Sequence, residues 1–331
     1  MTSSGSEKKG APASYAEFND PPPAGPLRTV VQFFAVPLLI VLVAVGLFLV
    51  VSMLFDTRPT TAMDYVRELR SDTINRRWQA AVELSNRLGN DEIPLEFRDP
   101  ILVDALTQAL ADARKEPEDP PMLAVHLLRV LRSLQDARAI PAIRDAADDP
   151  HPWIRSHALL VLGGLRDLAS LEIIERRLKD EDAECRKAAL FAMASLDQVK
   201  DEPFRLAGGT RARVRVYLGD PDPYVRMQAT LLLAQAGVSD GVLPLLAKML
   251  DREYLRDLPF SGDLHGTNRT RVNSNLLVQT ILAVSGLGEA SGDEEIEAAL
   301  KRLTDDSIEG NPEVRQQARV ALGKLRAAST G

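Results

Sequence analysis

The chain has 331 residues, of which 45% are hydrophobic and 26% are charged, and its formal net charge at pH 7 is −7. This composition is typical of ordinary folded protein, and the acidic balance argues against a bulk nucleic-acid binder. A single cysteine, Cys185, excludes an intramolecular disulfide and any metal site built from cysteines.

The first 28 residues are rich in serine, glycine and proline and show no apolar periodicity. Such a composition cannot bury enough apolar surface to fold, so residues 1–28 are predicted to form a disordered tail. A proline-rich ligand would need a P-x-x-P context with flanking basic residues, which is absent. The tail is therefore interpreted as a flexible tether.

Residues 29–55, which read TVVQFFAVPLLIVLVAVGLFLVVSMLF, carry no charge. About 20 apolar residues suffice to cross a bilayer as a helix, and this run is longer. A buried core helix would show a polar face, and a signal peptide has a shorter apolar region followed by a small-residue cleavage site. The run therefore predicts one transmembrane helix that is retained in the mature protein.

Basic residues flank the predicted span almost equally: Lys8, Lys9 and Arg28 precede it, and Arg58, Arg67, Arg70 and Arg76 follow it. The positive-inside rule therefore leaves the orientation open. A long domain after a first span can be translocated regardless of its charge. We expect a single-pass protein of a bacterial inner membrane, with the rest of the chain in the periplasm.

One pattern recurs after the span. Its clearest copies are DPHPWIRSHALLVLGGL from Asp149, DAECRKAALFAMASL from Asp182, DPDPYVRMQATLLLAQA from Asp220 and NPEVRQQARVALGKL from Asn311. In each copy an acid or amide in a turn precedes an arginine, and a small residue three positions later opens an apolar helical face. Weaker copies begin at Arg76, Met122 and Leu276. Copies spaced by about 30 to 50 residues indicate a repeat array.

Further amphipathic segments lie between these copies, beginning at Ala137, Leu168, Ser239 and Asp293. Each repeat is thus predicted to be a pair of antiparallel helices, which must stack on its neighbours to bury its apolar face. The predicted fold is all-α: an α-solenoid of about seven helical hairpins preceded by one transmembrane helix. Residues 57–89 are predicted to form the first hairpin and a linker, and residues 97–327 the remaining solenoid.

The turn aspartate, the (V/I)-R-x-x-A start and the A-(L/V)-x-x-L-G-x-L ending resemble HEAT-like repeats, in particular the short type first described in phycobilisome lyases. The resemblance covers about Thr61 to Ala327, although Ala124 and Leu277 take the arginine's place in two copies. It implies a solenoid that binds other proteins, since most solenoids of this class do so. The fold alone does not fix the function.

The repeated arginines, Arg77, Arg155, Arg186, Arg226 and Arg315, could form an anion-binding row. A residue that recurs in every unit more often serves the repeat itself. We therefore expect these arginines to bond turn aspartates or backbone carbonyls and to hold the stack together.

Two segments interrupt the repeat, Asp201 to Val216 and Asp251 to Asn275, and both are rich in arginine. Insertions in solenoids often lie on the binding face. The partner-binding candidates are Arg211, Arg213, Arg215, Arg256, Phe260, His265, Arg269 and Arg271. They could meet an acidic protein or anionic lipid headgroups. The alternative is a solvated loop and an ordinary amphipathic helix whose arginines face water.

No nucleotide-binding, hydrolase or metal motif is present, and the four histidines are scattered along the sequence. We therefore predict no catalytic, cofactor-binding or metal-binding residues. The favoured function is a membrane-anchored scaffold that binds proteins, without nucleic acid and without catalysis of its own. The alternatives are an accessory or chaperone-like subunit of a membrane enzyme complex, or a lyase-like enzyme related to bilin lyases.

Overall fold

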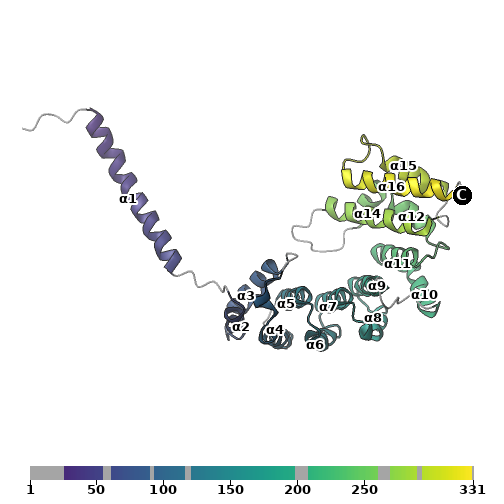
Figure 1. Ribbon diagram of the computed structural model, residues 1–331, viewed down its shortest axis with the longest axis horizontal. Helices are drawn as coiled ribbons and strands as arrows, with labels where there is room; N and C mark the ends of the chain where they lie inside the picture. Colours follow the sequence, from purple (N-terminus) through teal and green to yellow (C-terminus); the bar gives the residue numbers. More distant parts are fainter. Residues whose placement is uncertain are drawn as a thin grey trace, which may run out of the picture. The chain divides into compact units, whose positions relative to one another are not determined.

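The computed structural model describes residues 26–54, 61–89, 93–115, 121–197, 208–259, 269–288 and 293–329. In these ranges the regular secondary structure is helical throughout, so the predicted all-α class is confirmed (Figure 1). The chain divides into two units, Met1–Arg58 and Pro59–Gly331. Each unit is described by itself.

The described part of the first unit is one helix, α1 (Pro26–Leu54), which confirms the helix predicted for this apolar run. Its segment Phe33–Val51 has a mean hydropathy of 3.1, and none of it is buried within the protein. Nineteen residues of α-helix extend about 28 Å, close to the thickness of a bilayer's hydrocarbon core. By length and composition α1 can therefore cross a membrane.

The second unit consists of helix pairs along the described part of the chain. The first helices of the pairs are α2 (Ala62–Leu69), α4 (Pro100–Ala113), α6 (Ile140–Ala146), α8 (Leu171–Arg177), α10 (Gly208–Arg215), α12 (Leu243–Met249) and α15 (Glu294–Leu303). The second helices are α3 (Ile74–Arg87), α5 (Pro121–Leu134), α7 (Pro152–Leu165), α9 (Ala183–Asp197), α11 (Pro223–Gln235), α14 (Arg269–Leu287) and α16 (Pro312–Ser329). The predicted solenoid of helical hairpins is thus confirmed.

The pairs stack in chain order and form two layers. Each second helix packs against the second helix of the next pair, from α3 through α5, α7, α9, α11 and α14 to α16. We call this row the second-helix layer. The first helices α2, α4, α6 and α8 lie along one side of it and form the first-helix layer (Figure 1). The first pair packs on α4 and α5, so it belongs to the same stack as the pairs that follow.

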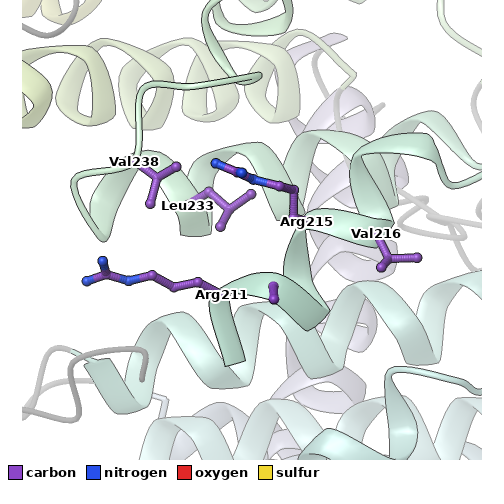
Figure 2. Close-up of a pocket in the computed structure, with 6 residues that line it drawn as sticks. Arg211, Arg215, Val216, Leu233 and Val238 are labelled. Carbon is purple, nitrogen blue, oxygen red and sulfur yellow. The ribbon is translucent and has the colours of Figure 1, made fainter. Parts of the chain in front are cut away.

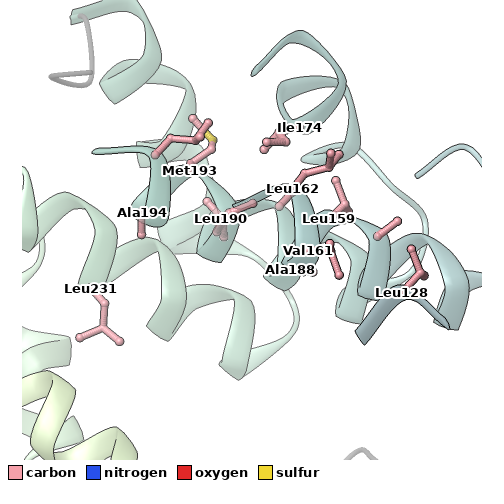
Figure 3. Packing of buried hydrophobic residues seen from close by; sticks show 14 of the residues in the cluster. Leu128, Leu159, Val161, Leu162, Ile174, Ala188, Leu190, Met193, Ala194 and Leu231 are labelled. Atoms are coloured by element: carbon pink, nitrogen blue, oxygen red, sulfur yellow. The ribbon is translucent and has the colours of Figure 1, made fainter. Parts of the chain in front are cut away.

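Buried aliphatic side chains fill the space between the layers. Figure 3 shows part of this core, in which Leu162 of α7, Ile174 of α8 and Met193 of α9 belong to one cluster and are fully buried. The closest approach in this region involves Gly163 of α7, where an added methyl group would lie 2.6 Å from the Cα atom of Ala192. Glycine at this position is what allows α7 and α9 to pack so closely.

Arg155 and Arg186 join successive units, as predicted, and Arg226 and Arg315 bond carbonyl oxygens of their own turns. Arg155 donates two hydrogen bonds to the carboxylate of Asp180 in the next unit, from Nε at 2.9 Å and from Nη2 at 2.7 Å. Its Nη1 atom donates to the carbonyl oxygens of Asp149 and Pro150 in its own turn. Arg186 makes the equivalent pair of bonds to the carboxylate of Asp220, at 2.9 and 2.8 Å. Each guanidinium group therefore fixes its own turn and binds the next one.

Two units that lack the repeat arginine receive a substitute from elsewhere. Ala124 takes the arginine's place in α5, and Arg114, at the end of α4, pairs with Asp149 at 2.7 Å. In the last pair of units Arg252 of the short helix α13 (Arg252–Asp257) bonds Glu309, with an Nη2–Oε1 distance of 2.6 Å. The acids of the turns are thus satisfied even where the sequence pattern fails.

The two arginine-rich interruptions are more regular than the sequence suggests. The first is helical from Gly208 onward, because α10 and a 3-10 turn (Val216–Gly219) form the first half of a unit. The second contains α13 and the start of α14, so its non-helical part is shorter than predicted. Its residues 260–268 lie outside the described ranges.

Candidate binding surfaces

The arginines of α10 lie at the surface, and two of them are paired. Arg213 donates from Nη2 to Glu175 Oε1 of α8 at 2.8 Å, and the Arg215 Nη2 atom lies 3.1 Å from Asp240 Oδ2. These side chains remain 56% and 49% exposed, respectively. Ion pairs this exposed contribute little to stability, about 0 to 1 kcal/mol, so an incoming anion could displace the acids.

A cavity of about 560 Å³ lies beside α10 and is lined by Arg211, Ala212, Arg215, Val216, Leu233 and Val238. Figure 2 shows Leu233 and Val238 between the side chains of Arg211 and Arg215, with Val216 on the other side of Arg215. The Nε atom of Arg211 is shielded from solvent and has no hydrogen-bond partner among the described residues. The cavity therefore combines an apolar wall with positive charge.

The structure does not bring Arg256 to this cavity. Arg256 lies on α13 beside Glu253 and Asp257, at nitrogen–oxygen distances of 3.8 and 3.4 Å. It lines a different cavity, of about 380 Å³, together with residues of α15 such as Arg302.

The other candidates from the second interruption have no described side chain. Phe260 and His265 lie outside the described residues, and only the backbone of Arg269 and Arg271, at the start of α14, is described. A single surface formed by the two basic segments therefore stays a prediction.

A second surface, which the sequence analysis missed, lies on the second-helix layer. His126 of α5 and His157 of α7 occupy the same place in successive units, two residues after Ala124 and Arg155. The four histidines look scattered when only their positions along the sequence are considered. Comparison across the repeat register would have placed these two on adjacent helices.

Both histidines sit among aromatic and polar neighbours. The rings of His126 and Trp78 of α3 meet edge to face, with centroids 5.2 Å apart. His157 Nδ1 lies 2.9 Å from the carbonyl oxygen of Trp153, one turn earlier in α7. Burial, the positive charge of Arg129 and the neighbouring His157 lower the pKa of His126. Burial also lowers the pKa of His157, although its bond to the Trp153 carbonyl acts in the opposite direction.

The same face continues across α9 and α11. Lys187 of α9 pairs with Glu184 on its own helix, and its Nζ atom lies 5.7 Å from the ring centroid of Tyr224. A cavity of about 150 Å³ opens between α7, α9 and α11, with His157, Leu160 and Phe191 among its lining residues. We call the surface formed by Trp78, His126, Arg129, Arg132, Trp153, His157, Lys187 and Tyr224 the histidine row.

Within the described ranges, no group of three His, Cys, Asp or Glu side chains is placed to hold a metal ion. Cys185 is buried and donates to the carbonyl oxygen of Pro152 at 3.2 Å. Burial raises the pKa of its thiol to about 12, so the sulfur stays protonated and unreactive at neutral pH. Cys185 is therefore a structural residue of the core and is not placed to act as a nucleophile.

Comparison with known proteins agrees with the fold. Residues 103–194 match the family of HEAT repeats. The phycocyanin lyase complex of CpcE and CpcF from Nostoc sp. is similar in structure, with a TM-score of 0.50 and 18% sequence identity over 81% of this chain and 96% of that chain. No curated protein matches the chain in sequence.

Two further solved structures are similar at lower TM-scores. Human deoxyhypusine hydroxylase has a TM-score of 0.34 and 19% identity, covering 80% of this chain and 96% of that chain. A designed armadillo repeat protein in complex with a (KR)4 peptide has a TM-score of 0.36 and 15% identity, covering 81% of this chain and 100% of that chain.

Proposed function

We propose that this chain is a single-pass membrane protein whose HEAT-like solenoid is a scaffold for other proteins and has no catalysis of its own. The apolar helix α1 would anchor it, since a segment of about 28 Å with no polar face is stable only in lipid or in a protein core, and none of it is buried in a core. The proposed location is a bacterial inner membrane, with the solenoid in the periplasm.

The observation that carries the proposal is the histidine row. Its aromatic side chains have no part in the arginine bonds that hold the repeats together, and Trp153 is 39% exposed. Exposed apolar residues continue on the same layer at Leu282 of α14 and Val320 of α16, which are 53% and 48% exposed. Protein interfaces are enriched in aromatic residues and arginine, which supports a protein as the partner.

The alternatives differ in what the partner does. An accessory or chaperone-like subunit of a membrane enzyme complex would use the same surface to hold an enzyme. A lyase-like enzyme related to bilin lyases would require a reactive polar groove, and support for it is limited to the likeness in fold to the phycocyanin lyase complex. Binding of an open-chain tetrapyrrole to the full chain, with transfer to an acceptor protein, would favour the lyase.

The membrane part is tested by extraction and by protease treatment. We expect the full chain to stay in the membrane fraction at alkaline pH and a fragment of residues 57–331 to remain soluble with a helical circular dichroism spectrum. Protease added to spheroplasts should degrade the solenoid if it is periplasmic. Recovery of the full chain in a high-speed supernatant would contradict the anchor, and protection of the solenoid would reverse the orientation.

The binding part is tested by placing a photo-crosslinking amino acid at one position of the full chain in its native membrane. Gln228 lines the cavity of the histidine row, Ala212 lines the cavity beside α10, and the exposed Lys179 in the turn after α8 is the control. We expect one defined protein adduct from Gln228 and none from Lys179. An adduct from Ala212 would extend the surface to the basic helix, and identical adducts from all three positions would contradict a specific surface.

A further inference from the structure

The histidine row contains positive charge that is not neutralised by its neighbours. Arg129 and Arg132 are exposed, and neither guanidinium group has an ion-pair or hydrogen-bond partner among the described residues. The nearby acid on this face, Glu184, is paired with Lys187. By contrast, the arginines that hold the repeats together have their carboxylates in place, as Arg155 does with Asp180. Within the histidine row, the unpaired positive charge therefore lies on α5.

The position of Arg132 depends on a glycine in the neighbouring helix. A methyl group added to Gly164 of α7 would lie 2.7 Å from the Nε atom and 3.3 Å from the Cζ atom of Arg132. The guanidinium group therefore lies across α7, where only a glycine leaves room for it. A glycine within a helix is less favourable than an alanine, so the room for Arg132 comes at a cost in helix stability.

Apolar and aromatic groups lie beside these charges. Trp78 packs against His126 on one side of α5, and Trp153 is partly exposed on α7. The cavity of about 150 Å³ that begins at His157 is lined by Leu160 and Phe191 and is bordered by the paired Glu184 and Lys187. A ligand that follows the row would thus meet two free guanidinium groups and then an apolar cavity.

We propose that the histidine row binds an acidic segment of a partner protein, with carboxylates on Arg129 and Arg132 and an apolar side chain in the cavity beside His157. The inference rests on the proposed scaffold function and names the chemistry of its partner. Carboxylates suit the planar fork of arginine, which can bind them through two parallel hydrogen bonds. Helices pack about 8 to 10 Å apart, so the face from α3 to α7 spans roughly 20 Å, or about six extended residues.

Nucleic acid fits this surface less well. Affinity for nucleic acid comes from many phosphate contacts, and the described row has two unpaired guanidinium groups in a chain of net charge −7. A short acidic peptide needs no more than these two groups and the apolar cavity.

The two histidines give the binding a dependence on pH. His126 faces Trp78 of α3, Arg129 of its own helix and His157 of α7. His157 faces Arg129 of α5, Glu184 of α9 and the Trp153 carbonyl oxygen. Both are neutral at pH 7 because their pKa values are lowered. Bound carboxylates favour the charged imidazolium, so binding takes up protons and tightens as the pH falls through the histidine range.

The test uses the full chain in detergent and a random 12-residue peptide library displayed on phage. We expect the selected peptides to combine acidic residues with an apolar residue, and to bind more tightly at pH 5.5 than at pH 7.5. In the double variant Arg129→Glu/Arg132→Glu the affinity for the selected peptide should fall about tenfold or more, since two charge-assisted bonds are lost. The control double variant Arg98→Glu/Arg302→Glu makes the same change of net charge at exposed positions elsewhere and should alter affinity less than about twofold.

Gly164→Ala provides a variant that keeps every charge. It should weaken peptide binding because it displaces Arg132, while the helical signal is retained and the melting temperature does not fall. The proposal would be overturned if the selected peptides were neutral or basic, or if no peptide were selected. It would also be overturned if the control variant lost as much affinity, or if a single-stranded oligouridine bound more tightly than the peptide. A protein adduct from Gln228 in the photo-crosslinking experiment would then show that the scaffold function stands without an acidic partner.

Discussion

Two adjacent glycines in α7 test the packing between successive units. A methyl group on Gly163 would lie 2.6 Å from the Cα atom and 2.9 Å from the Cβ atom of Ala192 in α9, so the two helices would have to separate. A methyl group on Gly164 would meet the flexible end of Arg132, which can swing away. The same substitution at neighbouring positions should therefore have opposite effects on stability.

The magnitudes follow from two terms. Replacing a helical glycine by alanine gains about 0.5 to 1 kcal/mol in either position. Overpacking typically costs about 1 to 3 kcal/mol, which applies only to Gly163→Ala. We expect Gly163→Ala to lose up to about 2.5 kcal/mol net and Gly164→Ala to gain up to about 1 kcal/mol. At about 2 to 4 °C per kcal/mol for a large domain, the two melting temperatures should lie several degrees on either side of wild type.

The assay is thermal unfolding of the full chain in detergent, followed by circular dichroism. Both variants should retain the wild-type helical signal at 25 °C, which separates a local packing defect from failure to fold. If both variants melted above wild type, or both shifted downward by the same amount, the close approach of α7 to α9 would be refuted.

Three further predictions concern the repeat and its titratable groups. Asp180→Ala leaves its partner Arg155 buried and unpaired, and it should lower the free energy of unfolding by about 3 to 5 kcal/mol. Asp148→Ala removes a carboxylate that is 43% exposed and should cost less than about 1 kcal/mol. Similar losses for the two variants in urea titration would contradict the buried bond. Ala189→Leu overpacks a fully buried site on α9 and should cost about 1 to 3 kcal/mol, and an unchanged melting temperature would mean that the repeat register is wrong. The pKa values of His126 and His157 are lowered from 6.5 in the folded protein, so the unfolded chain binds more protons below that pH. The free energy of unfolding should therefore fall as the pH falls through 6.5. A double glutamine variant at the two histidines should lose that part of the slope.

Most of the fold could be predicted because its signals are local. The apolar run of α1 needs only a count of consecutive residues, and the second helices repeat a period of about 3.6 after a polar turn. Proline at the first helical position marks the start of α7, α11 and α16 in the structure as it does in the sequence. Even Asp222, which caps α11 by accepting from the Tyr224 and Val225 amides, belongs to the repeated motif.

The substitutions within the arginine ladder could not be predicted, because they depend on tertiary proximity. Arg114 lies outside the repeat motif, and nothing within α4 indicates that it will reach Asp149, 35 residues later. The same is true of Arg252 and Glu309, which are 57 residues apart. A pattern defined by one position per repeat detects the loss of an arginine but not its replacement from another helix.

The histidine row was missed for a different reason, and that reason separates structural from functional residues in this chain. A repeat constrains the residues that bury the core and bond the turns, so Arg155 and Arg186 recur with their partner acids in place. Side chains on the exposed face of the second-helix layer are under no such constraint, and there the helices differ from one another. Arg129 has no bonding partner among the described residues and lies beside a histidine whose pKa is lowered, so it gains nothing for the stack. Two exposed arginines that bond no described group of the chain leave their charge available to a partner outside it.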